Sequence, residues 1–225
     1  MMHPNDPNLE FQLKFDPILL EKISDLQIRG ELHNITNFKF LAEGSDGIVN
    51  LIKFAEFDLI LTLKIYFLKK KNIKNLGQSS CERAKNEFYV NQLAYRKQLP
   101  VPKIFGVIKL DENIEKNNIQ LINLQNIKFE WLKKGHIDCN EQTGYYGIIK
   151  EYIPGKTIQE LISKKNQSER NWNYLYKKDK LIVEFEKAGF IIKDSHLSNF
   201  VISTHLSPYN NKIYLIDCQS LGAIP

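Results

Sequence analysis

The sequence predicts an α+β fold, in which a β-rich first half carries one helix and a helical second half ends in a small group of strands. Two observations support this prediction. Residues 38–67 and 103–109 consist of short apolar runs, rich in β-branched and aromatic residues, which is typical of strands. Residues 81–96, 157–165 and 171–188 instead have apolar residues at helical spacing.

The composition is that of an ordinary globular protein, with 43% hydrophobic and 25% charged residues in a chain of 225. This length is sufficient for one domain, or one domain of two lobes, and we expect a monomer. No apolar run approaches the roughly 18 residues of a membrane span, so we expect no membrane association. The net charge is +5, but only four basic residues are arginine, the preferred side chain for base and phosphate contacts. We therefore expect no nucleic-acid binding.

The cysteines indicate a compartment rather than a site. Cys81, Cys139 and Cys218 are widely spaced and show no metal-ligand pattern, so a zinc site is not expected. The composition is not that of a disulfide scaffold, and it fits a reducing, intracellular location. The first residues lack a basic region followed by an apolar stretch, so we expect no cleaved signal peptide. Export by a route that cleaves no signal remains an alternative.

The elements expected in the first half follow from caps and breakers. Asp16 can cap a helix, Ser79 or Ser80 can cap the next helix, and Pro100 stops it. In chain order we expect a helix over 16–32, a strand, glycine turn and strand over 38–54, a strand over 58–67, a helix over 81–96 and a strand over 103–109.

The second half begins after a polar stretch, 110–146, which we interpret as an insertion with strands inside 119–129. Pro154 and Gly155 end the next strand, and Gly189 ends the last helix. The elements expected here are a strand over 147–153, helices over 157–165 and 171–188, and short strands over 190–192, 200–203 and 212–216.

The sharpest functional signal lies among the last strands. Asp194 and Asn199 have a D-x-x-x-x-N spacing, and Asp217 follows the second strand of the hairpin after them. Such a hairpin can bring three oxygen-bearing side chains together, one to accept a hydroxyl proton and two to hold Mg²⁺. The alternative is that all three are ordinary turn and cap residues.

Three weaker signals precede it. Gly44, Gly47 and Val49 match a phosphate-binding glycine loop, G-x-G-x-x-G-x-V, in which Ala42 replaces the first glycine. A plain glycine hairpin would look the same. Lys64 lies inside a strongly apolar strand, where an unpaired ammonium would be costly. The alternative is an outward-facing lysine of a half-exposed strand. The expected partner of Lys64 is Glu87 in the middle of the next helix, with Glu82 as the rival near that helix's start.

The order of these signals resembles the protein-kinase-like superfamily from about residue 38 to the end, with the segment Glu151–Gly155 similar to the hinge between kinase lobes. The resemblance implies a minimal two-lobe fold. Its parts are an N-terminal helical extension over 1–37, a β-rich N-lobe over 38–153 with an insertion near 110–146, and a truncated helical C-lobe over 154–225.

The resemblance also implies roles for single residues, with ATP and Mg²⁺ as cofactors. Lys64 contacts the α- and β-phosphates and pairs with Glu87, Asp194 is the base that orients the attacking hydroxyl, and Asn199 and Asp217 bind Mg²⁺. The remaining nucleotide contacts come from Gly44, Ser45, Gly47 and Val49 of the glycine loop and from Glu151 and Ile153 of the hinge.

Departures from the family pattern indicate which kinds of kinase the chain resembles. The HRD motif is Ile192-Lys193-Asp194, the DFG motif is Asp217-Cys218-Gln219, and only eight residues follow Asp217. His196, two positions after the base, gives a D-x-H-x-x-N pattern similar to that of small-molecule, lipopolysaccharide and phage-associated kinases. In this chain we expect His196 to be either a substrate contact or a packed loop residue. The short form resembles effector kinases that bacterial pathogens deliver into host cells and that phosphorylate the chaperone Hsp90.

The sequence therefore predicts an ATP-dependent protein kinase, Ser/Thr rather than Tyr, constitutively active and acting on a host protein such as Hsp90. A small-molecule phosphotransferase and a pseudokinase or ATP-binding interaction module remain the alternatives. The residue types favour catalysis over binding alone, because a protein that only binds has no chemical need for Asp194.

Overall fold

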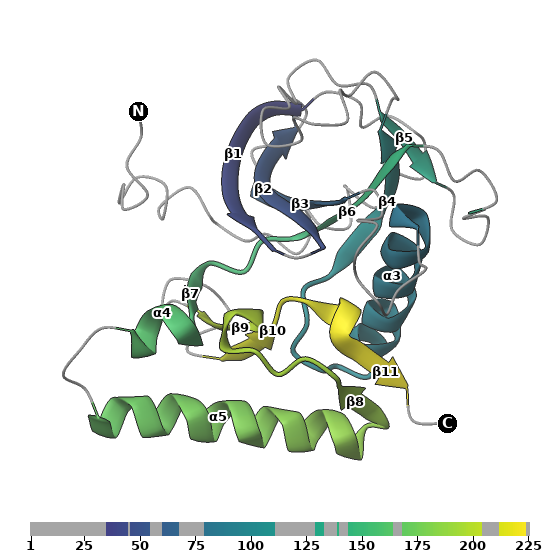
Figure 1. Cartoon of the computed structure of the whole chain (residues 1–225). Helices are drawn as coiled ribbons and strands as arrows, with labels where there is room; N and C mark the ends of the chain where they lie inside the picture. Colours follow the sequence, from purple (N-terminus) through teal and green to yellow (C-terminus); the bar gives the residue numbers. More distant parts are fainter. Residues whose placement is uncertain are drawn as a thin grey trace. The chain divides into compact units, whose positions relative to one another are not determined.

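The computed structural model describes residues 35–44, 46–54, 60–67, 79–110, 129–132, 139, 144–163, 168–203 and 212–223 (Figure 1). The predicted helix over 16–32 and Ser45 lie outside this set, as do most of the predicted insertion and most of the turn before the last hairpin strand. The chain divides into two compact units, one formed by Met1–Phe88 and Ile104–Tyr152, the other by Tyr89–Lys103 and Ile153–Pro225.

The first unit is built on a six-stranded sheet in which every pair of neighbouring strands is antiparallel. The central strands β3 and β6 are buried at almost every position, which explains their nearly continuous apolar sequences. In sheet order the strands are β1 (Ile35–Glu43), β2 (Gly47–Phe54), β3 (Ile60–Tyr66), β6 (Tyr145–Glu151), β4 (Ile104–Leu110) and β5 (Phe129–Leu132).

Helix α3 (Ser80–Arg96) packs its first half against this sheet (Figure 1). A capping box begins it: the Ser79 N–H donates to Glu82 Oε2 at 2.7 Å, and the Glu82 N–H donates to Ser79 Oγ at 3.2 Å. Cys81, Ala84 and Phe88 are spaced to lie on one face of the helix. They form an apolar cluster with Tyr66, Ile104, Val107, Tyr146 and Ile148 of the sheet.

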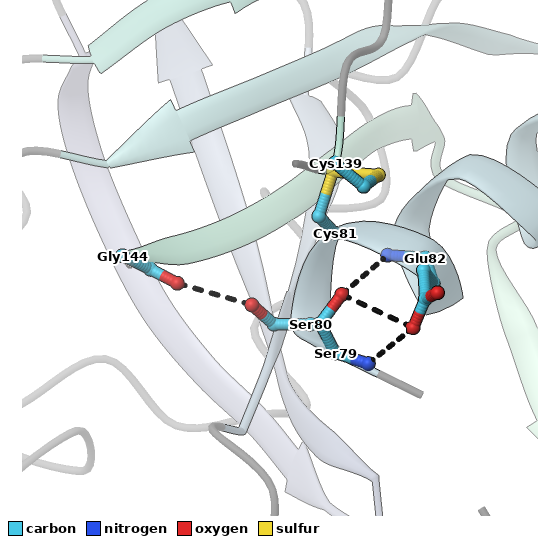
Figure 2. Close-up of a disulfide and its surroundings, with 6 residues drawn as sticks. All are labelled: Ser79, Ser80, Cys81, Glu82, Cys139 and Gly144. Carbon is cyan, nitrogen blue, oxygen red and sulfur yellow. Dashed lines mark hydrogen bonds between the residues drawn. A yellow bond between two sulfur atoms is a disulfide. The ribbon is translucent and has the colours of Figure 1, made fainter. Parts of the chain in front are cut away.

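A disulfide joins Cys81 to Cys139, a pairing that was not predicted from the sequence (Figure 2). The two cysteines are 58 residues apart, and no spacing rule links them in the sequence. They meet because the start of α3 lies against the start of β6, where Ser80 Oγ donates to the Gly144 carbonyl at 3.0 Å. Cys218 is free and buried.

The second unit combines helices with two small sheets. Helix α4 (Ile158–Ile162) starts with a capping box between Thr157 and Glu160. The three-stranded sheet has the order β10 (Ile213–Leu215), β9 (Phe200–Ser203), β7 (Gly155–Thr157), and the two-stranded sheet pairs β8 (Phe190–Ile192) with β11 (Leu221–Ala223). Helix α5 (Ser168–Lys187) contributes Leu181 and Phe185 to a core shared with Ala94, Val101, Ile158, Phe190, Phe200, Ile202, Leu215, Cys218 and Leu221.

The predicted α+β class is therefore confirmed as a mixed fold with mostly antiparallel strands and few helices. The strands and helices predicted within the described residues are present, with ends that differ by a few residues. Two three-residue strands, β7 and β11, were not predicted, because their pairing depends on distant partners rather than on local pattern. None of the described helices is both long and apolar enough to cross a membrane.

Candidate functional site

A buried cluster of three charged side chains, which we call the lysine–glutamate cluster, lies between the sheet and α3 in the first unit. Lys64 Nζ of β3 is 2.9 Å from Glu87 Oε2, and Lys150 Nζ of β6 is 3.0 Å from Glu87 Oε1. The residues are 4%, 0% and 5% exposed for Lys64, Glu87 and Lys150 respectively. The predicted pairing of Lys64 with Glu87 is confirmed, and the rival Glu82 instead takes part in the cap of α3.

The register of the sheet explains why two lysines reach one carboxylate. Lys64 lies opposite Ile148 in the antiparallel pair of β3 and β6, so the two side chains share a face of the sheet. Lys150 is two residues beyond Ile148 and points to that same face. Glu87 is one turn beyond Arg83 on the helix that covers this face.

Both oxygens of Glu87 are hydrogen-bonded within the first unit. Tyr66, fully buried on β3, donates its hydroxyl to Glu87 Oε2, the oxygen that Lys64 also contacts. Burial alone would raise the pKa of Glu87, but the charges of Lys150 and Lys64 and the hydrogen bonds from Tyr66 and Lys64 lower the pKa to about 2. Glu87 is therefore an anion at neutral pH.

The predicted glycine loop is a tight hairpin between β1 and β2. The Gly44 N–H donates to the Gly47 carbonyl at 2.9 Å, and Gly44 and Val49 lie on either side of the turn. A Cβ atom on Gly47 would lie 2.0 Å from the Ile65 carbonyl oxygen, so β3 itself requires glycine there. A Cβ atom on Gly44 would have one neighbour, the Gly47 carbonyl oxygen at 4.0 Å. The space beside the Gly44 backbone is therefore open. The fourth predicted loop residue, Ser45, lies outside the described residues.

The predicted hinge contains the point where the chain passes from one unit to the other, between Tyr152 and Ile153. The Glu151 carbonyl accepts a hydrogen bond from Thr62 Oγ1 at 3.2 Å. Ile153 is buried in a small cluster with Val201 and Tyr214 in the second unit. Both predicted adenine-binding positions therefore have contacts that hold the backbone in place.

A second group, which we call the aspartate–asparagine cluster, comprises Asp194, Asn199 and Asp217 in the second unit. Asn199 Nδ2 donates to Asp194 Oδ2 at 3.1 Å, and the N–H of His196 donates to Asp194 Oδ1 at 3.0 Å. The Ile216 N–H donates to the Asn199 carbonyl at 2.9 Å, which places the residue before Asp217 beside Asn199. Asp194 and Asn199 are thus in contact, and Asp217 follows a residue that is bonded to Asn199, on loops that flank β9 and β10.

The donor set of this cluster fits Mg²⁺. Asn199 uses its amide nitrogen on Asp194, so its amide oxygen is the atom that it can offer to a cation. Asp217 accepts the Gln219 N–H at 3.1 Å through Oδ1 and carries a second carboxylate oxygen. Hard oxygen ligands of this kind are those that Mg²⁺ takes. Among the described residues, no group of three or more His, Cys, Asp or Glu side chains is close enough to hold a metal ion.

His196 has a structural role that the sequence did not predict. It is exposed rather than packed, and its ring caps the short helical turn Leu197–Asn199. Its Nδ1 accepts the Ser198 N–H at 3.4 Å and lies 2.7 Å from Ser198 Oγ. The description of His196 as a packed loop residue is therefore wrong, and the ring instead helps to shape the turn that carries Asn199.

Comparison with known proteins does not assign the chain to a family. No protein-family model matches the chain, and no curated protein sequence matches it. The functional assignment therefore depends on the chemistry of the two clusters.

Lys150 is the main residue that the sequence analysis missed. The signal that singled out Lys64, a lysine inside a strongly apolar strand, is equally present in Gly147–Ile153, where Lys150 interrupts the run. That lysine is 5% exposed, and its ammonium contacts Glu87. Tyr66 left no comparable signal, because a tyrosine at the end of an apolar strand is ordinary core composition.

Proposed function

We propose that this protein is an ATP-dependent phosphotransferase with a kinase-like two-lobe fold, and that its acceptor is a protein hydroxyl. The observation that carries the proposal is the buried ion pair between Lys64 of β3 and Glu87 of α3. A buried pair contributes little net stability, because removing two charges from water is costly. Its retention in the core, at the positions that a kinase uses to hold a phosphate-binding lysine, favours a functional role.

In this proposal the first unit supplies positive charge. Lys64, oriented by Glu87, neutralises the α- and β-phosphates of ATP. The open space at Gly44 allows a phosphate oxygen to approach the backbone of the glycine hairpin. Val49 lies opposite Lys64 in the register of β2 and β3, so its side chain is on the same face of the sheet and provides an apolar contact for the base.

The second unit supplies the acid–base chemistry. Asp194 accepts the proton of the acceptor hydroxyl, whose oxygen then forms the new bond to the γ-phosphorus while ADP leaves. The hydrogen bonds from His196 N–H and Asn199 Nδ2 hold the Asp194 carboxylate in one orientation. Asn199 and Asp217 would hold Mg²⁺, which neutralises phosphate charge when bound.

A second candidate function is a nucleotide-binding module that does not transfer phosphate. It is favoured by the local hydrogen bonds of the aspartates, since Asp194 receives two donors from its own loop and Asp217 caps the turn Cys218–Ser220. Such bonds are common in ordinary turns. A small-molecule acceptor remains the alternative to a protein within the transferase proposal.

The test is incubation with γ-labelled ATP and Mg²⁺, with purified Hsp90 and with a eukaryotic lysate as acceptors. Wild type is compared with Asp194→Ala and Asp217→Ala, and Asp179→Ala on α5 is the exposed control. Label in a protein, lost in the first two variants and kept in the control, supports the proposal. Label only in small molecules assigns a different acceptor. ATP binding without transfer supports the binding module, and absence of nucleotide binding overturns both candidates.

A further inference from the structure

The two oxygens of Glu87 are held by different strands. Oε2 accepts from Lys64 and Tyr66 of β3, and Oε1 is 3.0 Å from Lys150 Nζ of β6. A carboxylate held on one oxygen can swing about its side-chain bonds, whereas a carboxylate held on both cannot turn without breaking a charge-assisted bond. Lys150 therefore contributes what Lys64 cannot, a second fixed point for the carboxylate.

The helix that carries Glu87 is also tied to the first unit at several points along its first turns. Cys81 is bonded to Cys139, and Ser80 Oγ donates to the Gly144 carbonyl at 3.0 Å. One turn later, Arg83 donates to the Phe67 carbonyl and to the Asp46 carbonyl, the latter at 3.1 Å. These attachments and Glu87 follow one another at helical spacing, so this face of α3 is held continuously.

Movement of Glu87 away from Lys64 would be strongly unfavourable. It would leave two ammonium groups in a region where both are nearly inaccessible to water, and an uncompensated buried charge costs several kcal/mol. The carboxylate therefore holds its position before any nucleotide binds.

We propose that Lys150 is a positioning residue for phosphoryl transfer, which holds Glu87 so that Lys64 keeps one pose and turnover needs no separate activator. This inference rests on the proposed phosphotransferase function. Lys150 acts through Glu87 and not on the nucleotide, so its effect differs from that of Lys64, which binds phosphate itself.

The test compares Lys150→Met with Lys150→Arg, which restores the cation, and with Lys85→Met, a half-buried lysine of α3 outside the cluster. One readout is the titration of the Glu87 carboxyl carbon by NMR, assigned with Glu87→Gln. Among the described residues, the charged and titratable groups bonded to Glu87 are Lys64, Tyr66 and Lys150 on the strands. Arg83, one turn earlier on the same helix, packs over the Tyr66 ring. Loss of Lys150 removes one favourable charge, so the Glu87 titration moves to higher pH.

The second readout is ATP turnover without any activating protein. Lys150→Met is expected to lower kcat on the order of 10-fold to 100-fold, as is typical when a catalytic group is slightly misplaced. Lys150→Arg restores kcat and the titration, and Lys85→Met changes neither. If Lys150→Met does not fold, Lys150→Gln provides a shorter side chain that keeps an N–H donor without the charge.

The inference is overturned if the Glu87 titration and kcat are the same in Lys150→Met, or in Lys150→Gln, as in wild type. It is also overturned if wild type turns over ATP only after a partner or modification activates it. A wild type that neither binds nor turns over ATP overturns the proposed function itself, a result recognisable because it precedes any substitution at Lys150.

Discussion

The two clusters of this protein hold their charges in opposite ways. The lysine–glutamate cluster is buried, and its members come from β3, β6 and α3, which are far apart in the sequence. Asp194 of the aspartate–asparagine cluster is exposed, and it is held mainly by residues two and five positions away. The first cluster depends on the tertiary fold, and the second depends mostly on local loop geometry.

Because of this difference, substitutions in the two clusters should affect folding stability and function to different degrees. Substitutions in the buried cluster leave uncompensated charges in the core and should affect folding as well as function. Substitutions of exposed Asp194 should affect function with little effect on folding. Measuring the free energy of unfolding and the rate of phosphoryl transfer in matched variants tests whether the two clusters differ in this way.

The largest expected effect on stability is that of Glu87→Gln. It removes the carboxylate that bridges Lys64 and Lys150 and should lower the free energy of unfolding by about 3–5 kcal/mol, measured by urea denaturation. Glu184→Gln on the exposed surface of α5 is the control and should stay within about 0.5 kcal/mol of wild type. A Glu87→Gln variant as stable as the control would show that the cluster is not a buried unit.

The next effect is that of the disulfide, which ties α3 to the first unit. Cys139→Ser, or reduction of wild type, should lower the free energy of unfolding by about 2–4 kcal/mol for a bond between residues 58 apart. Reducing agent should have no further effect on the Cys139→Ser variant, which serves as the internal control. Equal stability of oxidised and reduced wild type would contradict the bond.

The stability contributed by the lysine–glutamate cluster should depend on pH. The folded pKa of Glu87 is about 2, below its ordinary value of 4.5, so the stability that its charge contributes is present above pH 4.5 and is lost as pH falls towards 2. Urea denaturation at several acidic pH values should show this loss in wild type. Glu87→Gln should lack that part of the acid loss, and a parallel decline in both proteins would be evidence against the lowered pKa.

The smallest effect is expected for a cap in the second unit. Thr157→Ala removes the side-chain oxygen that accepts the Glu160 N–H at 3.1 Å, and it should lower the free energy of unfolding by about 1 kcal/mol. Thr157→Ser, which keeps the hydroxyl, is the matched control. An unchanged midpoint in Thr157→Ala would mean that α4 does not depend on its capping box.

The helices and strands that depend on local residue patterns could be predicted from the sequence. The apolar runs of β3 and β6 and the capped helix α3 were predictable, because burial and capping leave a direct trace in residue type. The pairing of Lys64 with Glu87 was also predictable, since a lysine in a core strand requires a partner. The contact between Asp194 and Asn199 was also predictable, because both residues lie in one short loop and their spacing can be read from the sequence.

The features that could not be predicted depend on contacts between distant segments. The Cys81–Cys139 bond needs the start of α3 to meet the segment before β6, and no sequence spacing encodes that approach. β7 and β11 are three residues each and exist only because they pair with β9 and β8. Lys150 left the same signal as Lys64, but its convergence on Glu87 follows from the register of β3 with β6.

The proposed phosphotransferase activity can be tested by measuring ATP affinity and phosphoryl transfer together in Lys64→Met and Asp194→Asn, each compared with wild type. Lys64→Met should weaken ATP binding and transfer together, because it removes the charge that the proposed function assigns to the phosphates. Asp194→Asn should bind ATP as wild type does and lose transfer by about 10²-fold to 10⁴-fold, the usual contribution of a general base. Transfer at the wild-type rate by Asp194→Asn would contradict the assignment of phosphoryl-transfer chemistry to this protein.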